Sequence, residues 1–208
     1  MRHAPVAELV DAVDSKSAVR TGVLVRVRPG APFLCLMHFH SRAAPMSFEI
    51  REATADQFEE VWPIFREVVR TGETYPYPMD TDLEEARALW FAPGARVYFG
   101  YLDGVAVASR YIVPNKPGLG AHVCNTGVMV DATVRGQGLG KKMMDFGLEK
   151  AKELGFKAIQ LNLVVSTNGA SLEICKRNGF QIVGTLPGAF HFRGERYVDA
   201  YVLYRDLS

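Results

Sequence analysis

A strand–helix–strand pattern over residues 122–165 constrains the fold of this chain more than any other feature of its sequence. The apolar run 122–130 predicts a strand, and the glycine-rich turn 134–142 leads into an amphipathic helical pattern that ends near Leu154. The β-rich run 158–165 predicts a second strand. Because a helix between neighbouring strands returns the chain to the edge of the sheet where it started, these two strands are expected to be parallel.

Signals on either side of this unit complete the expected order of elements. Asp103-Gly104 is the strongest short hairpin signal in the chain, and it joins two apolar strands. Pro63 lies inside a helical pattern, where it predicts a kink or a later helix start. The order β-α-α-β-β-β-α-β-α-β-β predicts an α/β single domain with one mixed, twisted central sheet. The expected strands are 47–52, 96–102, 105–113, 122–130, 158–165, 181–186 and 197–204, and the expected helices are 56–69, 83–91, 139–154 and 168–178.

The composition of the 208-residue chain excludes several classes of protein. The formal net charge is only +1, which gives no overall field for nucleic acid or for an anionic membrane surface. No apolar run approaches the roughly 18 residues that a membrane-spanning helix needs. Cys35, Cys124 and Cys175 lack metal-ligand spacing and cannot all pair with one another. We therefore expect a cytoplasmic globular protein with reduced thiols and no metal site.

The first 45 residues predict something other than a folded domain. Written back into codons, Glu8-Leu-Val-Asp-Ala12 resembles the D-arm of a leucine tRNA gene, and Val25-Arg-Val27 resembles its T-arm. The two segments are also separated as they would be in such a gene. We therefore interpret residues 1–45 as a non-native or disordered N-terminal extension, with the natural start at Met46 and one domain at residues 46–208.

The turn Val134-Arg-Gly-Gln-Gly-Leu-Gly-Lys-Lys142 combines three glycines with positive charge between a strand and a helix. Its spacing excludes both the Walker A loop and the dinucleotide fingerprint, because Lys141 stands where each motif requires its last glycine. What remains is Arg135-x-x-Gly138-x-Gly140. These glycines would let successive N–H groups turn toward one pyrophosphate at the positive end of a helix dipole. The alternative is a tight turn that needs glycine for its backbone conformation, beside solvated lysines.

In this context the chain resembles the GCN5-related N-acetyltransferases (GNAT). The family motif Arg/Gln-x-x-Gly-x-Gly/Ala matches Arg135, Gly138 and Gly140, and a second motif matches Asn168 through Gly179-Phe180. The resemblance covers about residues 47–206. It implies the GNAT fold, acetyl-CoA as cosubstrate, and cofactor contacts from the fourth strand, the glycine loop and the following short helix. The implied cofactor-binding residues are Val128, Met129, Val130, Arg135, Gly136, Gln137, Gly138, Leu139, Gly140, Lys141 and Asn168.

One position departs from the family pattern. Family members commonly carry a tyrosine on the short helix, proposed to protonate the departing thiolate, and alignment on Asn168 places Cys175 there. A thiol is a weak donor, and a CoA thiol with a pKa of about 8.5 leaves tolerably without an acid. We therefore assign Cys175 no catalytic role. Cys124, the rival nucleophile for a ping-pong reaction, is discounted because its strand parity is opposite to that of Asn125.

Two asparagines stand in apolar strands that disfavour them, Asn125 in HVCNTGVMV and Asn162 in IQLNLVV. A buried amide without a partner costs about 1–3 kcal/mol, so each side chain either satisfies a structural neighbour or faces a cleft. The GNAT resemblance implies that the two strands are adjacent, parallel and splayed apart where the acceptor binds. Gly127 is expected to permit a bulge in the first of them.

A closer resemblance concerns the acceptor. The segments TGETYP, YIVPN, HVCNTG, LNLVVSTN and GTLPGAF resemble the fungal acetyltransferases that N-acetylate azetidine-2-carboxylate, a proline analogue, and their bacterial relatives. This resemblance implies that Asn125 and Asn162 contact the substrate in the catalytic centre. Glu73 and Tyr75 lie on a loop that covers the acceptor cleft in this fold; the alternative is a loop anchored by packed rings. An asparagine cannot act as a base, so the amine proton must leave to water or to a side chain such as Glu73 or His122.

Together these features predict direct transfer of an acetyl group from acetyl-CoA to a small amino-acid-like amine in a ternary complex. The alternatives are another small amine or a peptide N-terminus as acceptor, and an acyl-CoA-binding regulatory module without turnover. The expected partner is a small-molecule amine rather than nucleic acid or a membrane. The oligomeric state is open, with a homodimer as one candidate.

Overall fold

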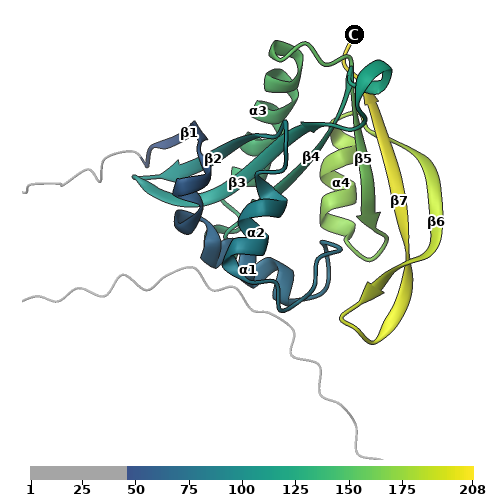
Figure 1. Cartoon of the computed structure of the whole chain (residues 1–208), viewed down its shortest axis with the longest axis horizontal. Helices are drawn as coiled ribbons and strands as arrows, with labels where there is room; N and C mark the ends of the chain where they lie inside the picture. Colours follow the sequence, from purple (N-terminus) through teal and green to yellow (C-terminus); the bar gives the residue numbers. More distant parts are fainter. Residues whose placement is uncertain (1–45) are drawn as a thin grey trace, which may run out of the picture. The chain divides into compact units, whose positions relative to one another are not determined.

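The computed structural model describes residues 46–208, so the interpretation of residues 1–45 concerns a part of the chain outside the described residues. The described elements follow the expected order (Figure 1). The strands are β1 (Phe48–Ala53), β2 (Arg96–Leu102), β3 (Val105–Pro114), β4 (Val123–Val130), β5 (Ala158–Val165), β6 (Gln181–Phe192) and β7 (Arg196–Asp206). The α-helices are α1 (Trp62–Arg70), α2 (Leu83–Trp90), α3 (Leu139–Glu153) and α4 (Gly169–Arg177).

The seven strands form one sheet in the order β1-β2-β3-β4-β5-β7-β6. β4 and β5 are the parallel pair and are joined through α3, whereas the other neighbouring strands are antiparallel. The mixed α/β fold expected from residues 122–165 is confirmed. In Figure 1, α1 and α2 lie in front of the sheet, and α3 and α4 lie behind it. Among the helices of residues 46–208, none is long and apolar enough to cross a membrane.

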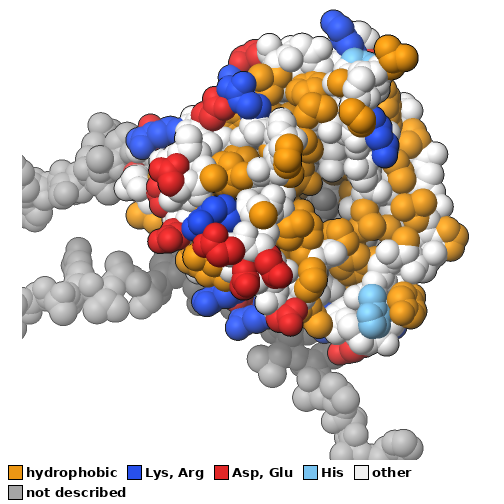
Figure 2. All heavy atoms as spheres, viewed as in Figure 1, with side chains coloured by type: hydrophobic (Ala, Val, Ile, Leu, Met, Phe, Trp, Pro, Cys, Tyr) orange, Lys and Arg blue, Asp and Glu red, His pale blue; other side chains and the backbone are white. Residues whose placement is uncertain are grey.

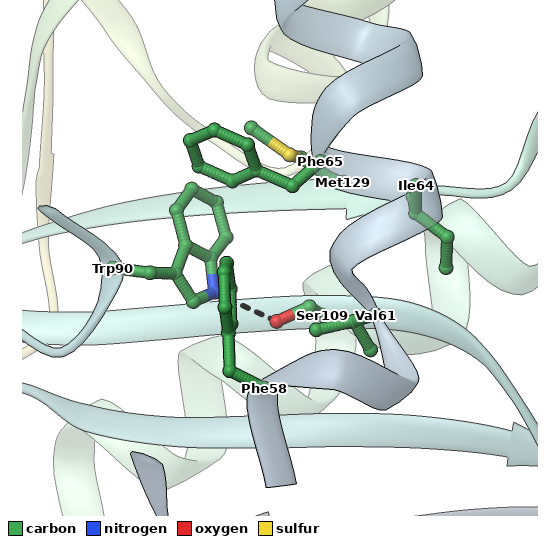
Figure 3. Close-up of a pocket in the computed structure, with 7 residues that line it drawn as sticks. All are labelled: Phe58, Val61, Ile64, Phe65, Trp90, Ser109 and Met129. Atoms are coloured by element: carbon green, nitrogen blue, oxygen red, sulfur yellow. Dashed lines mark hydrogen bonds between the residues drawn. The ribbon is translucent and has the colours of Figure 1, made fainter. Parts of the chain in front are cut away.

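Each face of the sheet has its own hydrophobic core. On the α1/α2 face, Phe65 packs edge-on against Trp90, whose Nε1 donates a hydrogen bond to Ser109 Oγ at 2.7 Å (Figure 3). That bond satisfies the indole N–H where water is excluded. On the α3/α4 face, Leu148 of α3 belongs to the same buried cluster as Ile159 of β5. Successive residues of a strand point to opposite faces, so β4 and β5 contribute side chains to both layers.

The helical pattern expected at residues 56–69 divides into two helices. A 3₁₀ helix covers Ala55–Glu60, and α1 begins at Trp62. Pro63 therefore lies in the first turn of α1, where the missing N–H leaves no intrahelical bond unmade. Of the two outcomes expected for Pro63, the structure has the later helix start.

β6 and β7 are longer than the sequence pattern indicated. The strand expected at residues 181–186 stops before Pro187 and Gly188, but β6 continues to Phe192. β6 is an edge strand that pairs with β7, and a register shift between Leu186 and Phe190 accommodates the proline and the glycine. The turn of the long β6–β7 hairpin contacts the loop that follows α1.

Candidate functional site

The site begins where β4 and β5 separate. Their parallel pairing comprises Val123 with Ala158 and Cys124 with Ile159, and beyond these pairs the strands diverge (Figure 1). Figure 2, drawn from the same side, shows the surface hollowed in this region, with hydrophobic side chains around the hollow. The structure therefore contains the splayed pair of strands that the family resemblance implied.

The main chain of β4 offers hydrogen-bonding groups to this gap. Asn115 N–H donates to the carbonyl of Val123 at 2.8 Å, and the β3–β4 register then continues without a shift. Since main-chain bonds alternate in an antiparallel ladder, odd-numbered residues of β4 bond to β3. Thr126, Val128 and Val130 therefore direct their N–H and C=O groups toward the side of β5, beyond the last paired residues.

The glycine loop lies at the N-terminus of α3. Gly138 is the residue before the helix and has φ 73° and ψ 8°, a left-handed conformation that side chains rarely adopt. A Cβ at Gly136, Gly138 or Gly140 would meet no atom within 4 Å, so the loop is open on its outer side. The first N–H groups of α3 have no partner within the helix, and the dipole makes this end positive. Lys141, at its rim, forms an exposed ion pair with Asp145 at 2.6 Å.

Asn168 caps the N-terminus of α4. Its Oδ1 accepts a hydrogen bond from Ser171 N–H at 3.1 Å, which satisfies one of the unpaired N–H groups of the first turn. The cap uses the oxygen of the amide, so the Nδ2 donors point elsewhere. The expected role in cofactor binding is thus compatible with a structural role in the same side chain.

Asn125 is half-buried at the point where the strands diverge. It follows Cys124, the last residue of β4 that pairs with β5. Its Nδ2 lies 3.5 Å from the hydroxyl of Tyr111, a long contact from which the amide can readily move to a ligand. Tyr111 lies on β3 and packs edge-on against Trp90 of α2, at a ring separation of 4.8 Å. Asn125 is therefore held on the α1/α2 face of the sheet.

Asn162 lies on the same face, but it is exposed. Its Nδ2 donates to Asn115 Oδ1 at 2.7 Å, and its Oδ1 accepts from Gln160 Nε2 at 3.0 Å. The register of β4 and β5 places Gln160 beside Asn125 and Asn162 two residues further along, on the same side of the sheet. The structure thus brings both asparagines to one face beside the gap, although each contacts its own polar neighbour rather than the other asparagine.

Tyr75 connects the loop after α1 to β4. Its hydroxyl donates a hydrogen bond to the carbonyl of Val128 at 2.8 Å, and burial raises its pKa well above the ordinary value. Its ring stacks on Tyr77 at 5.6 Å and lies 5.8 Å from the ring of Trp90. The packed rings of the alternative interpretation are present, and they place a tyrosine hydroxyl on one of the β4 carbonyls that face the gap.

Glu73 on the same loop is paired with the β6–β7 turn. Arg193 Nε donates to Glu73 Oε1 at 2.9 Å, and Nη2 of Arg193 donates to the same oxygen. The two segments also share a main-chain hydrogen bond, in which Arg193 N–H donates to the carbonyl of Gly72 at 2.8 Å. The loop and the long hairpin are therefore joined at this point by an ion pair and a main-chain bond.

His122 lies just before β4, and Gly127 lies within it. His122 is exposed, and its Nδ1 lies 3.2 Å from the carbonyl of Leu119, so its contact is with the loop before β4. The expected bulge at Gly127 is wrong, because the β3–β4 register runs through it without a shift. Glycine is required at this position for a different, steric reason, because a Cβ there would lie 2.5 Å from Cε1 of Tyr111. Gly127 leaves room for the ring that contacts Asn125.

Sequence reasoning missed two residues of β3 near the site. Arg110 and Tyr111 lie in the apolar segment VAVASRYIVP, and both are opposite the β4 residues that border the gap. A charged residue in an apolar strand is as unusual as the two asparagines were, so Arg110 could have been found by the same test. Tyr111 could not, because tyrosine is common in strands.

Both cysteines of the described residues are buried. Cys124 is 0% and Cys175 1% exposed, and burial raises the pKa of both thiols, that of Cys124 to about 12. A thiol with a raised pKa is a poor nucleophile at neutral pH, which agrees with discounting a ping-pong route through Cys124.

Replacing Cys175 with serine tests the interpretation that this residue is not an acid. We expect turnover to remain within several-fold of the original, while thermal stability falls because a hydroxyl is buried in an apolar cluster. Steady-state rates and a melting curve on the same preparation check this. A large loss of turnover at unchanged affinity for acetyl-CoA would restore Cys175 as the proton donor.

Comparison with known proteins identifies relatives that align with most of the described domain. The model of the acetyltransferase (GNAT) family matches residues 51–180. The N-acetyltransferase aca1 of Schizosaccharomyces pombe is 30% identical over 151 residues, which cover 64% of this chain and 72% of that protein. The L-amino acid N-acetyltransferase AaaT of Escherichia coli is 27% identical over 163 residues, which cover 75% of this chain and 96% of that protein.

Solved structures give the same result. A GCN5-related N-acetyltransferase from Kribbella flavida superposes with a TM-score of 0.71 at 36% identity, covering 76% of this chain and 97% of that one. YncA from Salmonella typhimurium, solved with its cofactor acetyl-CoA, superposes with a TM-score of 0.69 at 20% identity, covering 79% of this chain and 95% of that one.

Proposed function

Because this chain belongs to the GNAT family of acetyltransferases, we propose that it N-acetylates a small amino acid of the proline-analogue type by direct transfer from acetyl-CoA. Acetyl-CoA is the cosubstrate of this family, so the proposal concerns where it binds and which amine receives the acetyl group. The observation that carries the proposal is the pair Asn125 and Asn162 on one face of the sheet, beside the gap between β4 and β5.

The donor site of the proposal runs from α3 to β4. The loop from Arg135 to Lys141 would hold the pyrophosphate against the first N–H groups of α3, where three glycines leave open space. The pantetheine arm would follow β4 and bond to main-chain groups of Val128 and Val130, which face the side of β5. Met129 lies between these two residues and would line the path of the arm, although its own main-chain groups face β3. Asn168 would contribute an Nδ2 donor from α4.

The acceptor site of the proposal lies on the α1/α2 face. Asn125 and Asn162 each carry an amide that can donate to a carboxylate and accept from an amine. Tyr111 contacts Asn125, and Tyr75 packs against the same Trp90 ring as Tyr111, so both rings would offer apolar walls for a small acceptor ring. Glu73 would bind the amine through Oε2, because Arg193 bonds to Oε1.

The reaction requires an uncharged amine next to the thioester carbon. Neither asparagine can take the proton, so in this proposal it passes to water, with the amine held by hydrogen bonds. The N–H groups that β4 turns toward β5 would stabilise the developing oxyanion. Tyr75 already bonds to the carbonyl of Val128, which fixes the local orientation of that main chain.

Other acceptors compete with this one. Another small amine or a peptide N-terminus would depend less on hydrogen bonds from the side-chain amides of Asn125 and Asn162. A regulatory module would bind acetyl-CoA without turnover. The similarity to AaaT, which is named an L-amino acid N-acetyltransferase, favours an amino acid. A cytoplasmic location also belongs to the proposal, supported by the two buried free thiols of residues 46–208. A homodimer remains one candidate for the assembly.

Steady-state release of the CoA thiol with a panel of amines tests the proposal. We expect release with cyclic and acyclic amino acids, and slow or no release with monoamines and peptides of similar size. Initial rates at varied concentrations of both substrates should give intersecting lines, as for a ternary complex. Tight binding of acetyl-CoA without thiol release for any amine would favour the regulatory module, and a preference for peptides would move the acceptor to a protein N-terminus.

Replacing Glu73 with glutamine tests its role in acceptor binding. We expect the KM for the acceptor to rise about tenfold, as for a lost charge-assisted hydrogen bond. Arg193→Gln is the matched control, because it breaks the same ion pair but keeps the carboxylate; we expect it to change KM less. Both variants should be nearly as stable as the original, since the ion pair is exposed. Equal effects on KM would show that Glu73 only anchors the loop.

A further inference from the structure

A buried arginine lies between β3 and α3 without a full set of partners. Arg110 is 1% exposed, and its Nη1 donates to Thr126 Oγ1 at 2.8 Å. Its Nε and Nη2 are buried and have no hydrogen-bond partner, and none of the ion pairs within residues 46–208 includes it. Buried charges are normally paired, because the desolvation of an unpaired one is costly. The cost indicates that the cation does something other than stabilise the fold.

Helix α3 packs against Arg110, and its Gly147 leaves room for the guanidinium. A Cβ at Gly147 of α3 would lie 2.5 Å from Cζ of Arg110, so a larger residue there would displace the charged group. On the sheet, Arg110 is opposite Val128 in the β3–β4 register. The guanidinium is therefore fixed at the level of Thr126 and Val128, whose main-chain groups turn toward the gap between β4 and β5.

The groups around this cation are neutral at neutral pH. Its charge acts on Tyr75 of the loop after α1, Tyr111 of β3, Cys124 of β4 and Cys175 of α4. Burial raises the pKa of each of these four groups above its ordinary value, so none supplies an anion. Burial also lowers the pKa of Arg110, to about 10, which leaves the guanidinium charged at pH 7. Its field at the gap is thus not cancelled by these neighbours.

We propose that Arg110 provides the positive charge that stabilises the thiolate of CoA as it leaves. The inference rests on the proposed function, which places the thioester at the N–H groups that β4 turns toward β5, those of Thr126, Val128 and Val130. In the step, the amine nitrogen forms a bond to the acetyl carbon, the carbon–sulfur bond breaks, and its electron pair stays on sulfur. The amine proton passes to water. A nearby fixed charge lowers the free energy of the thiolate without transferring a proton, so Cys175 is not needed as an acid.

The test is the affinity of the protein for CoA and for acetyl-CoA, measured by calorimetry at a series of pH values. A free thiol of this kind has a pKa of about 8.5. If the guanidinium lowers the pKa of the bound thiol, CoA binds more tightly as pH rises from the bound pKa to the free pKa. Acetyl-CoA has no thiol, so the ratio of the two dissociation constants removes the titration of protein groups. We expect this ratio to change about tenfold for each unit of pKa shift.

Arg110→Met removes the charge and leaves a shorter, unbranched apolar side chain that fills part of the same space. We expect the affinity ratio to become independent of pH and kcat to fall by at least about tenfold, the equivalent of one pKa unit. The unfolding temperature should stay the same or rise, because an unpaired buried charge is removed. Thr126 keeps a partner in this variant, since its Oγ1 also donates to the carbonyl of Tyr111 at 2.5 Å. Arg110→Lys should retain part of the pH dependence.

Three outcomes separate the explanations. A flat affinity ratio in the original protein overturns the role of Arg110, even if Arg110→Met does not fold. A pH dependence that persists in Arg110→Met, together with a lower unfolding temperature, shows a structural role and also overturns it. If instead CoA and acetyl-CoA do not compete for one site, or Gly138→Asp leaves both affinities unchanged, then the proposed donor site is itself wrong.

Discussion

Replacing Gly138 with aspartate is expected to abolish measurable binding of acetyl-CoA. Gly138 precedes α3 in the left-handed conformation, with φ 73°, and the space outside it is open. A side chain at such a position costs about 1–2 kcal/mol, and a carboxylate would repel the pyrophosphate that the loop is proposed to hold. The dissociation constant measured by calorimetry, with the melting temperature of the same sample, gives the result.

Two variants separate charge from strain in this experiment. Gly138→Ala introduces the strained side chain without the charge, and we expect it to weaken acetyl-CoA binding less than the aspartate does. Gly104→Asp places the same residue at φ 83° in the β2–β3 turn, also in open space, and should leave binding unchanged. Unaltered affinity in Gly138→Asp would refute the assignment of the loop to the pyrophosphate.

Replacing Asn125 with alanine is expected to reduce kcat/KM for the acceptor by about ten- to hundredfold, as for a lost hydrogen bond to a charged group. The affinity for acetyl-CoA should change little, because the amide lies on the α1/α2 face, away from the glycine loop. The contact between Asn125 and Tyr111 is long, at 3.5 Å, so its loss should lower the stability of the fold only slightly. Acceptor kinetics and acetyl-CoA titrations on one preparation check both parts.

A structural asparagine serves as the control for Asn125. Asn178 ends α4 and its Nδ2 donates to the carbonyl of Ile174 at 2.8 Å, so Asn178→Ala should lower stability without a selective effect on the acceptor. If Asn125→Ala behaves in the same way as Asn178→Ala, then Asn125 serves its tyrosine neighbour and the acceptor proposal loses its central residue.

The fold could be predicted because its signals are local. The strand–helix–strand pattern at residues 122–165 requires a parallel pair, and Asp103-Gly104 marks a hairpin within two residues. The glycine loop could also be located from the sequence, because its glycine spacing and its position before a helix both lie within nine residues. Pro63 left two outcomes open, because local sequence does not show which turn of a helix a proline will occupy.

The details of the site depend on contacts between distant segments. The pairing of Glu73 with Arg193 joins residues 120 positions apart, and the sequence around neither residue indicates it. Gly127 was expected to permit a bulge, but its small size serves Tyr111 on the neighbouring strand. β6 runs through Pro187 because an edge strand tolerates a missing N–H, and strand order is not visible in a single sequence.

The central claim is tested most directly by comparing two acceptors that differ only in a carboxylate, azetidine-2-carboxylate and azetidine. The measurement is kcat/KM for each with saturating acetyl-CoA, with the N-acetyl product identified by mass. If Asn125 and Asn162 bind the carboxylate, the amino acid should be preferred by about tenfold or more, the contribution of a hydrogen-bonded charged group. The preference should shrink in Asn125→Ala. Equal rates for the two acceptors, or no product from either, would contradict the account.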